Sequence, residues 1–155
     1  GETAYLLAMY MEQCVLPAYE TETQKPSVLE VGAGCGLLGL VLAHAGCRVV
    51  LTEQSSTLPN LRRNTTRNSA ALDPGPVVAQ LQWGEVGDVA AVADHGPFDI
   101  IVGTDVWFAL DLVEPLLRTM HALSHERTII YLCMQERCPD THKRLMQLAP
   151  SYFAV

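Results

Sequence analysis

The sequence predicts an α/β domain built on a Rossmann-like, mostly parallel sheet with helices on both faces. Short apolar runs alternate with helical segments at the spacing of βαβ units. Several of these runs are apolar on both faces, which is typical of parallel strands that helices cover on each side. The length of 155 residues fits one domain. We therefore expect a single domain over residues 1–155, with a leading helix over 3–15 and a core over 27–155.

The leading helix is predicted from the apolar residues near the start of the chain. One broad helical face carries five of them, Leu6, Leu7, Met9, Tyr10 and Met11. Pro17 and the polar stretch 20–26 end the element.

The other elements follow from apolar runs that glycine, proline and polar residues interrupt. Strands are expected over residues 27–31, 47–52, 77–82, 99–103 and 127–133. Helices are expected over residues 37–45, 58–68, 85–94 and 139–148. A further helix should begin shortly before Pro115, since proline is tolerated only in a first turn. Another strand is expected from Tyr152 onward, and we expect the C-terminal part of the sheet to be missing beyond it.

Composition narrows the classes of partner. Ten Lys and Arg stand against 17 Asp and Glu, a formal net charge of −7. A nucleic-acid partner is not expected, because phosphate contacts need clustered basic residues. A membrane partner is not expected either, since no apolar run reaches the roughly 18 residues that span a bilayer. Five cysteines without a C-x-x-C pair predict reduced thiols, no metal site and a cytoplasmic protein, with the nucleus as the alternative.

A glycine-rich loop is the strongest local feature. Residues 30–36 read E-V-G-A-G-C-G and lie between an expected strand and an expected helix. Glycines let the backbone turn sharply and let a ligand approach the main chain. The next strand ends at Glu53, 17 residues after Gly36, where a carboxylate accepts both hydroxyls of a ribose. The two features together predict a nucleoside-containing ligand.

Two ligands compete for this loop, and a tight turn without a ligand is the third interpretation. A dinucleotide fingerprint, G-x-G-x-x-G, is spelled by Gly34, Gly36 and Gly39. The first glycine of that fingerprint normally follows the strand directly; here Gly32 does, and counting from it puts Leu37 at the third glycine position. The alternative pattern E-x-G-x-G-x-G keeps the register and includes Glu30. An acidic group there repels a pyrophosphate but suits S-adenosylmethionine, which carries an ammonium and a sulfonium.

The chain resembles the class I (seven-strand) methyltransferases, and more narrowly the protein-lysine methyltransferases marked by a D-x-x-Y motif. Four segments carry the resemblance: the leading helix at 2–12, the glycine loop at 28–39, L-Q-W-G at 81–84 and G-T-D-V-W-F at 103–108. The glycine loop alone is generic to the superfamily. The loop, the Trp83-Gly84 pair and the segment around Asp105 are together specific for the narrower group. The resemblance covers nearly the whole chain.

The resemblance implies seven cofactor-binding residues, namely Glu30, Gly32, Gly34, Gly36, Glu53, Trp83 and Thr104. The glycines would line the methionine and ribose of S-adenosylmethionine. Glu53 would hold the ribose hydroxyls. Trp83 would lie beside the adenine, since an aromatic face suits a purine; a tryptophan that only fills the core is the alternative.

The resemblance also implies two catalytic residues, Asp105 and Phe108. Asp105 follows the fourth strand, where it would hold and desolvate an amine; a helix N-cap is the alternative. Phe108 stands where the family has tyrosine, so the ring is kept and the hydroxyl is lost. Gln82 similarly replaces an acidic residue.

The resemblance implies methylation of a protein side chain, with lysine as the first choice and S-adenosylmethionine as cofactor. A protein is therefore the expected partner. Two alternatives stay open: a small-molecule methyltransferase, and a non-catalytic interaction domain that keeps the fold, which Phe108 favours.

Overall fold

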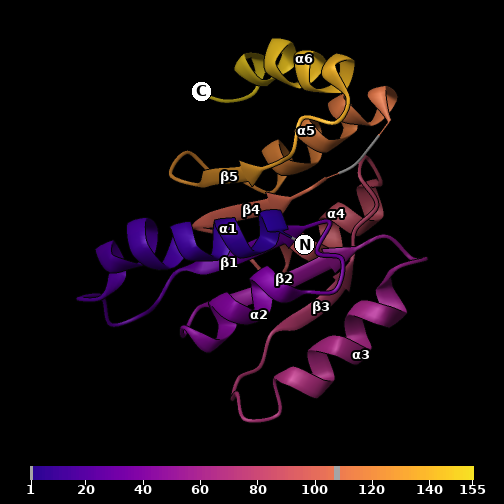
Figure 1. Cartoon of the computed structure of the whole chain (residues 1–155). Coiled ribbons are helices and arrows are strands. Elements are labelled where there is room, and N and C mark those ends of the chain that lie inside the picture. The colour runs from indigo at the N-terminus through magenta and orange to yellow at the C-terminus, as the bar shows by residue number, and fades with distance from the viewer. Residues whose placement is uncertain (1, 107–108) are drawn as a thin grey trace.

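A computed structural model describes residues 2–106 and 109–155 and confirms the predicted fold class. All strand pairs are parallel, in the order β3-β2-β1-β4-β5 (Figure 1). The strands are β1 (Ser27–Val31), β2 (Arg48–Glu53), β3 (Val77–Gln80), β4 (Ile100–Thr104) and β5 (Ile129–Cys133). Strand β1 lies at the centre, so the glycine loop that follows it starts from the middle of the sheet.

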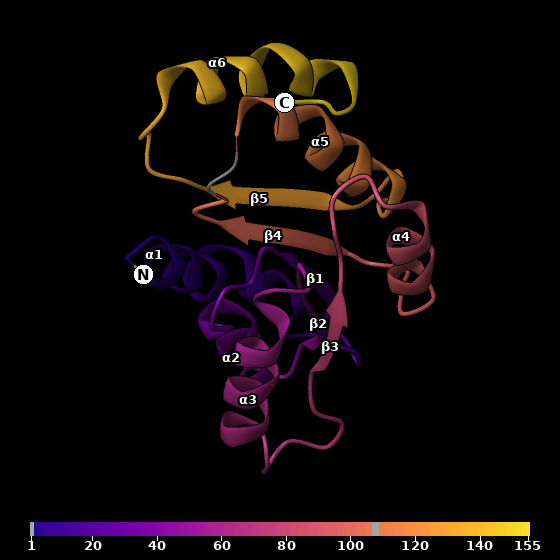
Figure 2. The same ribbon diagram turned by 90° about the vertical axis from the view of Figure 1, so that its right-hand side faces the viewer.

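Six α-helices are described around this sheet. They are α1 (Glu2–Tyr10), α2 (Leu37–His44), α3 (Leu58–Asn68), α4 (Val86–Ala93), α5 (Val113–Ala122) and α6 (Pro139–Leu148). In Figure 2, α1 to α3 lie on one side of the sheet, and α4 and α5 lie on the other. Among the described residues, none of the helices combines the length and apolar character that crossing a bilayer requires.

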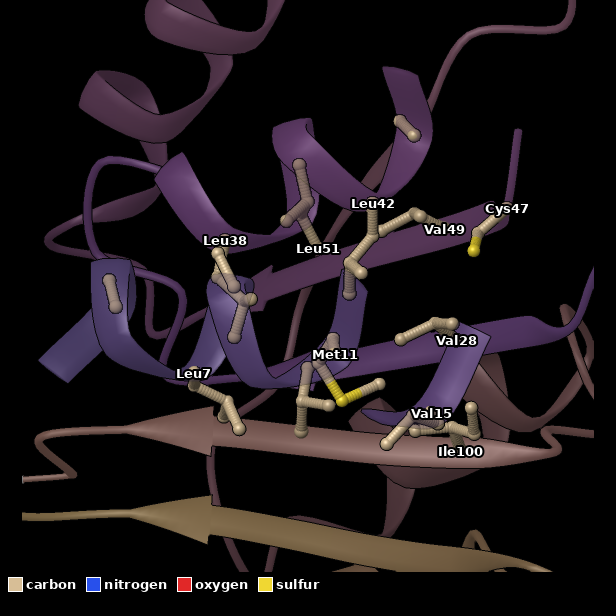
Figure 3. Packing of buried hydrophobic residues seen from close by; sticks show 14 of the residues in the cluster. Leu7, Met11, Val15, Val28, Leu38, Leu42, Cys47, Val49, Leu51 and Ile100 are labelled. Atoms are coloured by element: carbon tan, nitrogen blue, oxygen red, sulfur yellow. The ribbon is translucent and has the colours of Figure 1, made fainter. Parts of the chain in front are cut away.

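Two apolar clusters, one on each face of the sheet, hold the layers together. Figure 3 shows the first, where Leu7 and Met11 meet Leu38 from α2 and Ile100 from β4. The second cluster packs α4, α5 and α6 against the other face, with Phe98 among its most buried members. Each fully buried side chain of this size stabilises the fold by about 1.5–3 kcal/mol. The strands are therefore fixed on both faces, which keeps their ends in place.

Most element boundaries confirm the prediction. Strand β1 and helices α3 and α6 match residues 27–31, 58–68 and 139–148. Helix α5 begins at Val113, so Pro115 lies in its first turn as expected. The other strands and helices agree with their predicted ranges to within two residues at either end.

The leading helix corrects one expectation. The predicted helix over 3–15 is α-helical only to Tyr10; a π-helix (Met11–Val15) and a 3₁₀ helix (Leu16–Tyr19) continue it. Three of the five residues on the predicted apolar face, Leu6, Met9 and Tyr10, are exposed. The buried positions instead follow a narrower stripe, spaced by three or four residues, where α1 packs against α2 and the sheet: Thr3, Ala4, Leu7, Ala8, Met11 and Val15.

The strand expected from Tyr152 onward is wrong as well. A 3₁₀ turn (Ala149–Ser151) leads into this segment, and the rings of Tyr152 and Phe153 lie 5.9 and 5.8 Å from the His121 ring on α5. The Tyr152 hydroxyl donates a hydrogen bond of 3.2 Å to Glu114. The aromatic pair packs on α5, so the segment does not extend the sheet, and β5 is the edge strand of the described chain.

A substitution at Gly39 tests how closely α2 approaches the sheet. A Cβ at this position would collide with the Leu51 side chain and lie 2.9 Å from Glu30 Oε1. Gly39→Ala should lower the free energy of unfolding by about 1–3 kcal/mol, because the packed helix has to shift. Urea denaturation measures the effect. Gly87→Ala is the matched control, since nothing lies within 4 Å of a Cβ there and its stability should be unchanged or slightly raised. Equal stability of the two variants would contradict the close packing.

Candidate functional site

The carboxyl ends of β1, β2 and β4 meet at one cavity of about 300 Å³. Four residues predicted from the sequence line it together: Gly32, Glu53, Trp83 and Asp105. In open parallel sheets ligands bind at this edge, outside the carboxyl ends of the strands. The structure therefore joins the glycine loop, the acidic end of β2, the tryptophan and the D-x-x-Y aspartate in one place.

In the glycine loop, Gly32 lines the cavity without a side chain. Gly32 and Gly36 have φ of +60° and +90°, a region that favours glycine. A Cβ at Gly32 would lie 3.3 Å from Val106 Cγ1 and 3.7 Å from the Trp83 ring. A larger residue at this position would therefore fill the space between the loop and the tryptophan. The Ala33 N–H donates to the Thr52 carbonyl at 3.0 Å, which ties the loop to β2.

Glu53 is held by the backbone on both carboxylate oxygens. Its Oε2 accepts a hydrogen bond of 3.0 Å from the Gly34 N–H, and its Oε1 accepts one of 2.9 Å from the Gln54 N–H. Each carboxylate oxygen can accept two hydrogen bonds, so each keeps one acceptor position. The carboxylate is oriented in advance and can accept the two hydroxyls of a ribose.

Trp83 lines the cavity and also packs against the core. Its ring lies against Gly32 and also packs on the cluster beneath α4 and α5. Hydrogen bonds fix the chain on both sides: the Gln82 N–H donates to Asp88 Oδ2 and the Gly84 N–H to Thr119 Oγ1, each at 2.9 Å. The two interpretations from the sequence, adenine wall and core residue, are compatible with this one position.

Asp105 directly follows β4 with a φ of +43°, which is uncommon for a residue other than glycine. Its N–H donates to the Cys133 carbonyl at 3.0 Å. Its carboxylate accepts hydrogen bonds from the Thr3 hydroxyl at 2.5 Å and the Gln135 N–H at 3.3 Å. The Thr3 hydroxyl, the Gln135 amide and the nearby Arg137 charge lower the pKa of Asp105, so the carboxylate is ionised at neutral pH.

The described helices do not support the interpretation of Asp105 as a helix N-cap. The 3₁₀ helix (Leu110–Leu112) has Ala109 as its cap, and α5 has Leu112. Asp105 instead lines the cavity.

Glu30 is the predicted cofactor residue that the structure places away from the cavity. Its side chain is 1% exposed and accepts a hydrogen bond of 3.0 Å from the Gly39 N–H. Burial, the first cause, and the nearby charge of Glu53 raise the pKa of Glu30 to about 8. The carboxyl is therefore protonated at neutral pH and supports the first turn of α2.

Three further predicted residues, Gly34, Gly36 and Thr104, do not line the cavity. Gly34 donates its amide to Glu53, and Gly36 directly precedes α2. Thr104 is the half-buried last residue of β4. Phe108 lies outside the described residues.

The sequence reasoning missed Thr3, Val106, Leu112 and Gln135. Only Thr3 left a signal, as a polar residue four positions before Leu7 in the buried stripe of α1. The others contribute an apolar surface or a backbone amide, and such contributions do not depend on residue type in a recognisable way.

Comparison with known proteins gives one family. A family described as lysine methyltransferase matches residues 2–151. The mouse protein N-lysine methyltransferase METTL21A is 33% identical over 134 residues, which are 85% of this chain and 58% of that protein. The mouse protein-lysine methyltransferase METTL21E is 36% identical over 118 residues, 76% of this chain and 48% of that protein. The chain thus spans about half the length of these relatives.

A solved structure agrees on the fold. Magnesium protoporphyrin IX methyltransferase from Synechocystis PCC 6803, with bound S-adenosylmethionine, superposes with a TM-score of 0.62. The alignment covers 94% of this chain and 66% of that chain at 16% sequence identity. At this identity the likeness shows a shared fold.

The buried Glu30 carboxyl makes a pH-dependent contribution to stability. The unfolded chain ionises Glu30 near its ordinary pKa of 4.5, whereas the folded chain keeps the proton up to about 8. The contribution is therefore complete below pH 4.5 and is lost as the pH rises through 8. Glu30→Gln keeps the acceptor for Gly39 and cannot ionise. Its free energy of unfolding should rise relative to the native protein by about 1 kcal/mol per pH unit between pH 5 and 8.

Urea denaturation at pH 5, 6, 7 and 8 measures this difference. Glu126→Gln, the same substitution at an exposed position, is the control for the change of side chain itself. A constant difference for Glu30→Gln would mean that Glu30 is ionised in the folded protein.

Proposed function

The chain belongs to the lysine methyltransferase family, and on that premise we propose that it binds S-adenosylmethionine and methylates a lysine side chain of a protein. One observation carries the proposal. Gly32, Glu53, Trp83 and Asp105, which the family resemblance assigned to cofactor and substrate, line a single cavity at the carboxyl edge of the sheet. The names of the relatives support lysine as the acceptor and a protein as the partner.

The residues present fit the cofactor. Glu53 keeps one free acceptor position on each oxygen for the ribose hydroxyls. Trp83 offers an aromatic wall for the adenine. Gly32 leaves room for a ligand close to the main chain. The carboxylates of Glu53 and Asp105 in one cavity favour a positively charged ligand.

Asp105 has the position and charge to receive the amine. When bound, the cofactor supplies a methyl group on a positively charged sulfur. Lysine has an ordinary pKa of about 10.4, and only its neutral amine is nucleophilic. The ionised Asp105 accepts hydrogen bonds from the arriving ammonium and, after the ammonium has lost a proton to solvent, from the neutral amine, and it orients this nitrogen toward the cavity. Val106 and Leu112 give the cavity apolar walls. Orientation of this kind supplies several kcal/mol of a reaction barrier.

The proposal extends to partner and compartment. A formal net charge of −7 suits a basic protein segment more than a nucleic acid. Reduced cysteines, which the absence of a C-x-x-C pair predicts, fit a cytoplasmic protein. A membrane partner is not part of the proposal.

Cofactor binding should depend on Glu53. Glu53→Ala should weaken S-adenosylmethionine binding roughly 10- to 100-fold, because hydrogen bonds to a charged group contribute about 1.5–3 kcal/mol. Isothermal titration calorimetry measures the affinity, and thermal melting checks the fold. The control Glu126→Ala removes an exposed carboxylate outside the cavity and should bind normally. No measurable binding by the native chain would end the methyltransferase proposal.

Methyl transfer should depend on Asp105. Labelled S-adenosylmethionine incubated with the chain and a cell extract should place label in protein, on lysine. Asp105→Asn should reduce this labelling about 100-fold or more while cofactor affinity falls far less, because the amide keeps the shape and loses the charge. Glu126→Gln is the control. Label in small metabolites would favour a small-molecule methyltransferase, and binding without any transfer would favour a non-catalytic domain.

A further inference from the structure

A threonine of the first helix contacts the candidate catalytic carboxylate. Thr3 lies in the buried stripe of α1 and is 4% exposed. Its hydroxyl donates a hydrogen bond of 2.5 Å to Asp105 Oδ2, although the two residues are 102 positions apart in the chain. Apolar residues fill most of the same stripe, including Leu7 and Met11. A hydroxyl in such a position needs a partner, and Asp105 is that partner.

Asp105 needs outside support to keep its conformation. A φ of +43° is unfavourable for a residue with a Cβ and persists when the surroundings fix it. The described contacts come from two directions. The Cys133 carbonyl accepts from the Asp105 N–H, and the Gln135 N–H donates to Oδ1 at 3.3 Å, both from the β5 side. Thr3 approaches from α1 and makes the shorter bond to the carboxylate, so it determines where Oδ2 points.

We propose that Thr3 is a positioning residue, whose hydroxyl fixes the Asp105 carboxylate in the orientation that presents its free acceptor positions to the amine. The inference rests on the proposed function, in which Asp105 receives a lysine. A carboxylate has about four acceptor positions. Among the described residues, Thr3 and Gln135 occupy one on each oxygen, which leaves the others for a ligand in the cavity that Asp105 lines.

The charges around Asp105 agree with this role. Arg137 lies in the segment after β5, and Cys133 is the last residue of β5. Glu53, at the end of β2, lines the same cavity as Asp105. Glu136, which precedes α6, and Cys138 and His142 of the α6 region share a second, smaller hollow with Asp105. Of these surroundings, the Thr3 hydroxyl contributes most to holding the pKa of Asp105 below its usual range. Loss of the hydroxyl should therefore raise that pKa as well as release the side chain.

Two substitutions of Thr3 separate the hydroxyl from the shape of the side chain. Thr3→Val keeps the β-branched volume and removes the donor, whereas Thr3→Ser keeps the donor. Thr3→Val should lower kcat, taken as the rate at which label enters cell-extract protein at saturating S-adenosylmethionine, about tenfold to 100-fold, as expected when a group that positions the substrate is displaced by about 1 Å. Its affinity for S-adenosylmethionine should stay within about twofold of the native value. Thr3→Ser should recover most of kcat.

A second measurement does not depend on turnover. Carbon-13 NMR titration of the side-chain carboxyl of Asp105 should give a higher pKa in Thr3→Val than in the native chain, and a native value in Thr3→Ser. Thr128→Val is the matched control, because it also removes a threonine hydroxyl that donates to the protein, at 2.7 Å to the Phe98 carbonyl near the other end of the sheet. It should change neither kcat nor the pKa of Asp105.

The outcomes separate this inference from the proposed function. If the native chain binds no cofactor or transfers no methyl group, the proposed function fails, and the inference about catalysis fails with it, while the titration still decides whether Thr3 orients Asp105. If the native chain is active and Thr3→Val keeps the native kcat and the native pKa of Asp105, the positioning role is wrong and the function stands. Should Thr3→Val not fold, Thr3→Ala gives the same two measurements.

Discussion

The site depends on one constraint: β1, β2 and β4 run parallel and in register, so their carboxyl ends reach the same edge of the sheet. Val31 on β1 lies opposite Gly103 on β4. Gly32 therefore begins its turn beside the residues that lead to Asp105. Strand β2 lies on the other side of β1, and its last residue, Glu53, reaches the same edge. Helices on both faces bury these strands, which leaves their ends as the place where polar side chains can meet.

Much of the fold could be predicted because apolar runs and breakers fall where the chain changes direction. The run at 27–31 is bounded by proline and glycine, and its limits match β1. The leading helix was harder, because apolar residues occur on most of its circumference and only its neighbours decide which are buried. Leu7 packs against α2 and the sheet, whereas Leu6 faces away. The strand predicted from Tyr152 onward is wrong for a related reason. Tyrosine has a high β-propensity, but here its ring packs against a residue on a helix.

The cavity could be predicted in part, because position relative to a strand end is visible in sequence and side-chain direction is not. Gly32, Glu53 and Asp105 each end or follow a strand, so the sheet brings them together. Glu30 also lies near a strand end, but β1 is buried on both faces. The Glu30 side chain therefore turns toward the Gly39 amide. The contact between Thr3 and Asp105 joins two motifs from opposite parts of the chain. Neither motif by itself indicates that contact.

The structure changes the reason for preferring a positively charged ligand. The sequence suggested that the charge of Glu30 would repel a pyrophosphate, yet this carboxyl is buried and protonated at neutral pH. The negative charge of the cavity comes from Glu53 and from Asp105, whose pKa is lowered. Gly39, the last glycine of the dinucleotide-like spacing, packs against Leu51 beneath α2 and does not line the cavity. A pyrophosphate would add negative charge between two carboxylates, whereas a sulfonium beside an incoming ammonium is attracted by both.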